Sequence, residues 1–297
     1  MVPRIDRKRT ITGAGLAAAG ALVLLFVVGA SRSGAAPGEA ADRALIGEAR
    51  RGGVTVPIAP AVAIPLTRAK APGRPIVVID PGHGGRDPGA VAVSGAVSEK
   101  QLTLALAREL RAKLAERGRV RVALTREGDQ YLTLEQRAAI ARRLGAGLFL
   151  SLHMDSAPNP LARGASVYSL SDVASDADAA RFAQIENSSG GYVAPPANSV
   201  QAMLSDLAVR GQMSASADLA ARLVRKSGAR FGLRPEPHRF ATFHVLRRAE
   251  TPAVLFEAGY ISNADDELLL RDPKYRASIV TALAETIEAD VASRLRR

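Results

Sequence analysis

The sequence predicts an α/β layered fold with parallel strands in its first half. Short apolar runs typical of buried strands alternate with segments that have the four-residue spacing of amphipathic helices. Hydrophobic residues make up 47% of the 297 residues, which is enough for a large core, and aromatic residues only 4%. The chain has no cysteine, so disulfides and thiolate ligands are excluded. Any metal must be held by histidine, aspartate or glutamate.

The chain is basic, with 40 lysines and arginines against 29 acidic residues and a net charge of +11. This balance suits a polyanionic surface such as nucleic acid, acidic lipid or an anionic wall polymer. Ten basic and four acidic residues lie within residues 1–71. No nucleic-acid-binding motif is recognisable and aromatic stacking platforms are scarce, so we do not expect a nucleic-acid partner.

The N-terminus predicts export. A basic segment precedes residues 10–31, which carry no charge and are rich in alanine, leucine and valine. Residues 1–32 are therefore expected to be a cleaved signal peptide or an uncleaved membrane anchor, and both readings stay open. In either case the rest of the chain reaches the periplasm or cell envelope, with possible anchoring to the inner membrane. Residues 33–74, rich in alanine, proline and glycine, predict a flexible linker, and residues 75–297 the folded domain.

The first predicted strand leads to the first candidate site residue. Four aliphatic residues at 76–79 lie between two prolines and predict a buried strand, and the glycine-rich loop after it contains His83. Buried strands commonly end where ligands bind. Asp80 and Asp87 lie close enough in sequence to be hydrogen-bond partners of a histidine ligand.

Two capping boxes predict two helices. Each box pairs serine or threonine with a glutamine three residues later, and each helix is expected to end at a glycine: Ser98 and Gln101 with Gly118, and Thr133 and Gln136 with Gly145. Glu99 falls in the first turn of the first helix. Further strands are predicted at residues 119–126, 147–152, 165–170, 243–246 and 253–256.

Two more candidate site residues, His153 and Glu257, directly follow the predicted strands at residues 147–152 and 253–256. Residues 175–231 predict a helical insertion with a break near residues 188–196, too long for a simple connection. Apolar residues spaced by four from residue 279 to residue 295 predict a closing helix.

Two histidines and a carboxylate, with a second carboxylate nearby, are the residue types of a catalytic zinc site. Such a site leaves one position open for water, and a free carboxylate can take that water's proton. Because the ligands are far apart in sequence and no HExxH helix exists, the spacing alone is only moderately specific.

Five segments in register resemble the zinc-dependent N-acetylmuramoyl-L-alanine amidases of bacterial cell walls: IVVIDPGHGGRDPGA, SEKQLTLALA, LTREGD, LFLSLHMDSAP and PAVLFEAGYISN. The resemblance runs from residue 76 to about the C-terminus. It implies a mixed, mostly parallel sheet of about six strands flanked by helices on both faces, and one zinc ion held by His83, Glu99 and His153. Glu257 matches the catalytic glutamate. The implied reaction is hydrolysis of the amide between N-acetylmuramic acid and L-alanine of peptidoglycan, for wall remodelling and daughter-cell separation.

The insertion resembles that of a subset of this family, in which a helical segment blocks the zinc with a glutamate. Glu186, in the segment AQIEN, is the candidate for that role. The alternative is a solvated helix residue. In such enzymes, activator proteins with degenerate LytM-type peptidase domains release the block at the division site, so we expect autoinhibition and such a partner. Many relatives also carry an N-terminal β-sandwich domain, for which residues 33–74 are too short.

Other residues receive lesser roles. Asp80 and Asp155 are candidate partners of the ligand histidines, and Arg126 and Arg137 are candidates for orienting acidic stem peptides. His238 and His244 are expected to be structural. Two other functions stay open: a zinc peptidase acting on other peptides, and a non-catalytic wall-binding regulator. The presence of all four site residues argues against the second.

Overall fold

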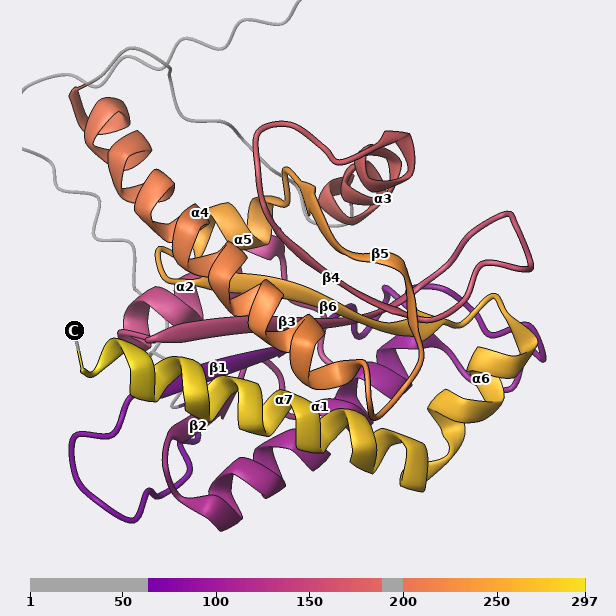
Figure 1. Cartoon of the computed structure of the whole chain (residues 1–297), viewed down its shortest axis with the longest axis horizontal. Helices are drawn as coiled ribbons and strands as arrows, with labels where there is room; N and C mark the ends of the chain where they lie inside the picture. Colours follow the sequence, from indigo (N-terminus) through magenta and orange to yellow (C-terminus); the bar gives the residue numbers. More distant parts are fainter. Residues whose placement is uncertain (1–63, 189–199, 297) are drawn as a thin grey trace, which may run out of the picture. The chain divides into compact units, whose positions relative to one another are not determined.

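A computed structural model describes residues 64–188 and 200–296 of the chain (Figure 1). From residue 76 to residue 155, strands and helices alternate as the sequence predicts. The elements in chain order are β1 (Ile76–Pro81), α1 (Glu99–Arg117), β2 (Arg121–Leu124), α2 (Leu134–Leu144), β3 (Leu148–Asp155), β4 (Ala165–Leu170), α3 (Ala177–Ser188), α4 (Val200–Ser227), β5 (Leu233–Ala241), α5 (His244–Arg248), β6 (Ala253–Tyr260), α6 (Ala264–Arg271) and α7 (Pro273–Arg294).

The six strands form one mixed sheet in the order β2-β1-β3-β6-β4-β5. The first four are parallel to one another, β4 is antiparallel to β6, and β5 is parallel to β4. The prediction of a mostly parallel sheet of about six strands is confirmed. Since β1, β3 and β6 are parallel neighbours, their carboxyl ends meet at one edge, where ligands bind in open α/β sheets.

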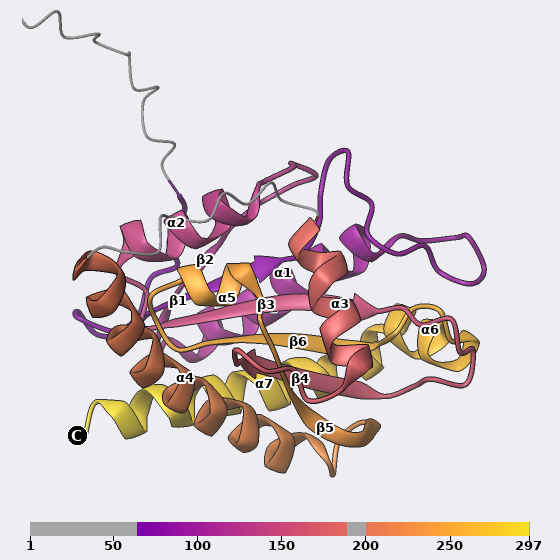
Figure 2. The ribbon, with the colours of Figure 1, turned by 90° about the horizontal axis from the view of Figure 1, so that it is seen from above.

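Helices cover both faces of the sheet, and each face has its own apolar core. Leucines of α1 and apolar residues of α4 and α7 pack on one face. Residues of α2, α3 and α5 pack on the other. Figure 2 shows α4 and α7 on one side of the strands and α2, α5 and α3 on the other. The face under α3 is the one that carries the candidate site.

The two predicted capping boxes are present. Ser98 precedes α1 and Thr133 precedes α2, and each forms the reciprocal bonds with the glutamine three residues later. Both helices end at a glycine in the left-handed conformation, Gly118 or Gly145. Helix α1 therefore starts at Glu99, as expected, and that start fixes where the Glu99 side chain lies.

Two elements of the structure differ from the prediction. Residues 243–246, expected as a strand, belong to helix α5 and its N-cap, Phe243. The strand lies earlier, at β5, which contains Pro235 and Pro237. Proline lacks the N–H that an inner strand needs, but β5 is the edge of the sheet, where this loss is tolerated. Helix α6 was not predicted.

The folded domain begins earlier than residue 75. The Thr67 and Lys70 amides donate to the carbonyls of Val122 and Gly118, at 3.0 and 2.9 Å, so residues 67–70 run along the outer side of β2. They cover an edge that would otherwise expose unpaired backbone groups. The expected leader, residues 1–32, and most of the expected linker lie outside the described residues. Within the described part, no helix is long and apolar enough to cross a membrane.

Candidate metal centre and active site

The loop after β1 places His83 against His153, with ring centroids 4.9 Å apart. His83 has a backbone φ of 60°, which is rare for a residue with a side chain. Two glycines make the approach possible. A Cβ at Gly82 would lie 2.4 Å from the ring of His153, and one at Gly89 would lie 2.6 Å from both the Glu99 carboxylate and the His83 ring. These two positions therefore require glycine, because any side chain there would collide with a residue of the site.

Glu99 lies between the two histidines and is buried. One carboxylate oxygen lies 3.0 Å from Nε2 of His83 and the other 3.0 Å from Nδ1 of His153. The backbone N–H groups of Ala90 and Met154 donate to these oxygens at 3.0 and 2.9 Å. Burial alone would raise the pKa of Glu99, but the nearby histidines lower it well below its usual range. Glu99 is thus held as a carboxylate facing both rings.

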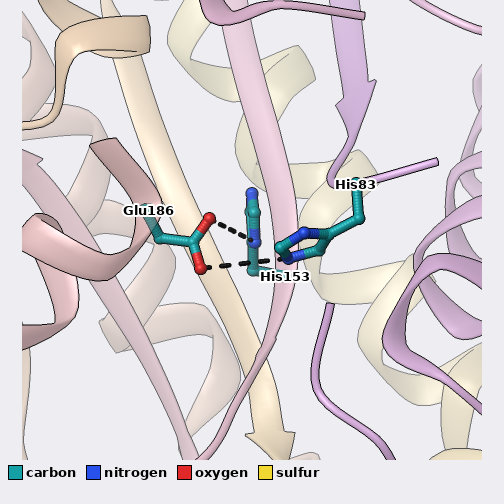
Figure 3. Close-up of side chains that lie close together, drawn as sticks. All are labelled: His83, His153 and Glu186. Carbon is teal, nitrogen blue, oxygen red and sulfur yellow. Dashed lines mark ion pairs between the residues drawn. The ribbon is translucent and has the colours of Figure 1, made fainter. Parts of the chain in front are cut away.

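A third side chain completes a candidate metal-binding group. The ligand atoms of His83, His153 and Glu186 all lie within 4.8 Å of one another (Figure 3). The Glu186 oxygens lie 3.8 Å from Nε2 of His83 and 3.4 Å from Nδ1 of His153. Figure 3 shows the carboxylate of Glu186 pointing at the two rings. The site therefore contains two histidines and two carboxylates, Glu99 and Glu186.

These spacings fit a tetrahedral zinc ion. With zinc–ligand bonds of about 2.0–2.1 Å, neighbouring ligand atoms are about 3.4 Å apart. The separations of 3.0, 3.4 and 3.8 Å between histidine nitrogens and carboxylate oxygens are close to that value. Nε2 of His83 is buried, and carboxylate oxygens of Glu99 and Glu186 lie 3.0 and 3.8 Å from it. A buried imidazole nitrogen that faces two carboxylates is an arrangement that a bound cation would satisfy.

Asp87, rather than Asp80, is the partner of His83. Its carboxylate lies 3.0 Å from Nδ1 of His83. Burial lowers the pKa of His83, but Glu99, Asp87 and Glu186 outweigh burial and raise it to about 11. Asp87 also accepts from the Gly89 amide at 3.1 Å. It therefore fixes which nitrogen of His83 faces the site.

Asp80 does not contact either histidine. Its carboxylate accepts from Thr125, Arg137 and Ser151 at 2.5, 2.8 and 3.0 Å. Burial would raise the pKa of Asp80, yet the charge of Arg137 and the hydrogen bonds lower it. The expectation of a direct histidine partner is wrong for Asp80. Ser151 was missed, although it lies two residues before His153 and so on the same face of β3.

Arg126 and Arg137 are not available to orient substrate, which corrects that expectation. Both are buried. Arg137 donates to the carbonyls of Pro81 and His83 at 2.8 and 2.7 Å, and Arg126 donates to those of Pro81 and Gly82 at 3.0 and 2.8 Å. Their role is to hold the histidine loop in its unusual conformation. Sequence position alone does not reveal this, because arginines at element ends are usually solvated.

Asp155 also lacks a direct contact with a ligand histidine. It accepts hydrogen bonds from the Tyr260 hydroxyl and, at 2.7 Å, from the Ser156 amide. Burial raises the pKa of Asp155 to about 6 despite these bonds. The expectation that it partners a histidine is therefore wrong, and it belongs to the neighbouring cavity described below.

Glu257 lies beside His153 on the adjacent strand, β6, paired with it in register. It is fully buried, and neither carboxylate oxygen has a hydrogen-bond partner among the described residues. Burial, followed by the charges of Asp155, Glu99 and Glu186, raises the pKa of Glu257 well above its usual value. Buried carboxyl groups without partners are costly, and they are frequent at functional sites.

Glu186 comes from α3, which lies on the site face of the sheet. Phe182 packs on Tyr168 and Phe243, with ring centroids 5.4 and 5.6 Å apart. The side-chain amide of Asn187 donates to the Thr242 carbonyl at 2.7 Å. The cavity at the cluster measures only about 10 Å³, the lower limit for one water molecule. With α3 in this position, the space at the cluster is no larger than a single water molecule.

The remaining histidines are not part of the cluster. His238, on β5, lies 2.9 Å from the Ser169 hydroxyl. His244 is the first residue of α5, and its backbone amide donates to the side-chain oxygen of Asn187 at 2.8 Å. A structural role for both therefore stays a prediction.

The fold and the cluster define an α/β protein with a His-His-Glu group that could hold a metal ion at the carboxyl ends of parallel strands. A family model for N-acetylmuramoyl-L-alanine amidases matches residues 77–289. AmiA of Escherichia coli strain K12, an N-acetylmuramoyl-L-alanine amidase, is 36% identical over 223 residues, which are 73% of this chain and 76% of that protein. AmiC of Neisseria meningitidis serogroup B is 32% identical over 72% of this chain and 52% of its own length.

Among solved structures, the catalytic domain of the amidase CwlV from Bacillus (Paenibacillus) polymyxa var. colistinus superposes with a TM-score of 0.53 and 28% identity. The match covers 72% of this chain and 96% of that domain. The chain belongs to the N-acetylmuramoyl-L-alanine amidase family and is an enzyme of that class, as its motifs predicted.

Proposed function

We propose that this chain is a zinc-dependent amidase that cleaves the amide between N-acetylmuramic acid and L-alanine in peptidoglycan, and that Glu186 holds it inactive at rest. The observation that carries the proposal is the pair of neighbouring strand ends. The end of β3 carries His153, which faces His83 and Glu99. The end of β6 carries Glu257, which is buried and has no hydrogen-bond partner among the described residues.

His83, Glu99 and His153 would hold the zinc ion, which when bound acidifies a water molecule and polarises the scissile carbonyl. The protein prepares the donors for this. Asp87 lies 3.0 Å from Nδ1 of His83, so Nε2 is the nitrogen that faces the site and would offer a lone pair to zinc once its proton is released. The two histidines lower the pKa of Glu99 despite its burial, and two backbone amides hold its oxygens in place. Arg126 and Arg137 fix the loop, so these directions persist without substrate.

Glu257 would act as general base and then as general acid. It would accept a proton from the attacking water and pass it to the nitrogen of the leaving alanine. A carboxyl group with an ordinary pKa releases a proton too readily to protonate an amine well. The raised pKa of Glu257 favours the return of that proton to the leaving nitrogen.

Glu186 would block the enzyme by filling the fourth ligand position, which in catalytic zinc sites holds water. Its oxygens lie at ligand-like separations from both histidines, and the cavity has no room for substrate. Activity then requires α3 to leave the site, a shift between two states of the protein.

The test is release of dye from labelled peptidoglycan by the purified full chain, compared with Glu257→Gln and Glu186→Ala, with zinc content measured for each. We expect weak activity for the wild type, a large increase for Glu186→Ala and none for Glu257→Gln, with zinc retained in all three. Release by Glu257→Gln at the wild-type rate would remove its assigned role. No release by any variant would overturn the amidase proposal in favour of a wall-binding regulator.

We further propose that residues 1–32 direct export and that residues 33–63 connect them to the folded domain. The basic segment followed by an uncharged apolar stretch supports this, as does the location of the wall substrate. A degenerate LytM-type activator at the division site would move α3. N-terminal sequencing of the protein from the envelope fraction distinguishes a cleaved leader from an anchor. The partner would be supported if such an activator increased dye release by the wild type but not by Glu186→Ala.

A further inference from the structure

A second cavity, of about 780 Å³, lies beside the metal centre, a volume typical of ligand sites. Its walls come from α3, the loop after β3 and the strands β4, β5 and β6. Asp155, two residues beyond His153 on β3, is one of the residues that line it. Two residues of a strand span about 6.6 Å, so the cavity begins within the reach of a short peptide extending from the scissile amide.

The charge of this cavity is mostly positive. Four arginines line it, against two aspartates: Arg163, Arg181, Arg234 and Arg239, with Asp155 and Asp178. Three of the arginines already have acidic partners. Arg163 pairs with Asp265 at 2.8 Å, Arg181 with Asp178 at 3.7 Å, and Arg239 with Asp176.

Arg234 differs from the other three. Nη1 donates to the Tyr260 hydroxyl at 2.8 Å and Nε to the Pro235 carbonyl at 3.3 Å. No carboxylate of the described residues pairs with it, and Nη2 has no hydrogen bond there. Guanidinium groups bind carboxylates through two parallel N–H donors, and Arg234 keeps such donors free beside an open volume.

We propose that this cavity binds the carboxylate groups of an acidic stem peptide, with Arg234 as the residue that recognises the free carboxylate. This inference rests on the proposed amidase function, because it assigns a subsite for the peptide side of that substrate. The position beside Asp155, on the strand that carries His153, places the subsite next to the reacting amide.

Asp155 does not oppose an anionic ligand strongly. Its carboxylate is only 5% exposed and accepts from the Tyr260 hydroxyl and the Ser156 amide. Tyr260 in turn accepts from Arg234. Arg234, Tyr260 and Asp155 are thus linked by hydrogen bonds, and the oxygens of Tyr260 and Asp155 accept bonds from within the protein. The guanidinium group of Arg234 lines the cavity.

The experiment uses two synthetic N-acetylmuramoyl peptides that differ only at the second stem residue, a free carboxylate in one and a carboxamide in the other. Binding of each to the zinc-depleted full chain is measured by calorimetry, so that hydrolysis does not interfere. The variants are Arg234→Gln and Arg234→Lys, with Arg225→Gln as the control. Arg225 is an exposed arginine of α4 that does not line the cavity, so its loss removes the same charge elsewhere.

We expect the acid to bind the wild type and Arg225→Gln at least tenfold more tightly than the amide. The ratio should fall close to one in Arg234→Gln, and Arg234→Lys should keep part of it through its charge. Equal binding of both compounds to the wild type, or an unchanged ratio in Arg234→Gln, would overturn the subsite. Thermal unfolding of each variant shows whether it is folded.

The two compounds are then offered as substrates to the zinc-loaded Glu186→Ala protein. Hydrolysis of both at the same kcat/KM would overturn the subsite and leave the amidase proposal intact. No hydrolysis of either, with the binding ratio preserved, would overturn the amidase proposal and leave the subsite. Hydrolysis of the acid at least tenfold faster supports both.

Discussion

Asn187→Ala should activate the enzyme without touching the metal site. Asn187 is the residue after Glu186, and its side chain makes two hydrogen bonds to the segment between β5 and α5. Its amide group donates to the Thr242 carbonyl at 2.7 Å, and its oxygen accepts from the His244 amide at 2.8 Å. These bonds exist only while α3 is docked, so their loss weakens the docked state alone.

The expected size follows from these two bonds. A typical hydrogen bond contributes about 0.5–1.5 kcal/mol, so losing both weakens docking by about 1–3 kcal/mol. At about 1.4 kcal/mol for each factor of ten, the undocked fraction rises about 5- to 150-fold. Dye release should increase by the same factor, up to the activity of Glu186→Ala, which sets the ceiling.

Ser188→Ala is the matched control. The Ser188 hydroxyl donates only to the Ile185 carbonyl within the same helix, at 2.7 Å, so its loss leaves docking unchanged. The double variant Asn187→Ala/Glu186→Ala should be no faster than Glu186→Ala. The reasoning is refuted if Asn187→Ala and Ser188→Ala behave alike, or if the double variant exceeds the ceiling.

Three further predictions concern the fixed part of the site. Asp87→Ala should weaken zinc binding about 10- to 100-fold by chelator competition, because His83 loses the partner that orients it; unchanged affinity would count against this role. Gly89→Ala should lose most of its bound zinc, since the new Cβ lies 2.6 Å from the His83 ring at a φ of 66°, and zinc content near one per chain would contradict that. Asp80→Asn should lower the free energy of unfolding at pH 7 by about 3 kcal/mol, as a buried charge is left unpaired on Arg137. Because the folded pKa of Asp80 is depressed, its contribution is full above the unfolded pKa of about 3.9 and is lost as pH falls through the lower folded pKa. Denaturant unfolding from pH 7 to pH 2.5 should therefore show the difference shrinking in acid, and a constant difference would refute this origin.

The fold was largely predictable because its signals are local. Capping boxes set the starts of α1 and α2, and the apolar runs of β1, β3 and β6 are buried on both faces. The strand β5 was not found because its prolines argue against an inner strand, and only the complete sheet shows that it is an edge. The run at residues 243–246 was too short for periodicity to distinguish a helix from a strand.

The candidate site was predictable where a residue directly follows a strand or opens a helix. His83, Glu99, His153 and Glu257 occupy such positions, and parallel pairing brings those ends together. The surrounding network was not predictable in the same way. Which aspartate partners His83 depends on the course of one loop, since Asp80 and Asp87 are both close in sequence.

The contacts that hold the histidine loop differ from the contacts that hold α3. The proposed block by Glu186 would therefore leave the metal ligands undistorted. The carbonyls of the histidine loop accept hydrogen bonds from the buried side chains of Arg126 and Arg137. Glu186 reaches the same histidines from α3, whose residues Phe182 and Asn187 contact Tyr168 and Thr242 instead of the loop. Undocking α3 therefore removes one carboxylate and the roof of the site, while the donors that would hold zinc keep their positions. The activator proposed above would need to overcome only the docking of α3, because the remaining site is already formed.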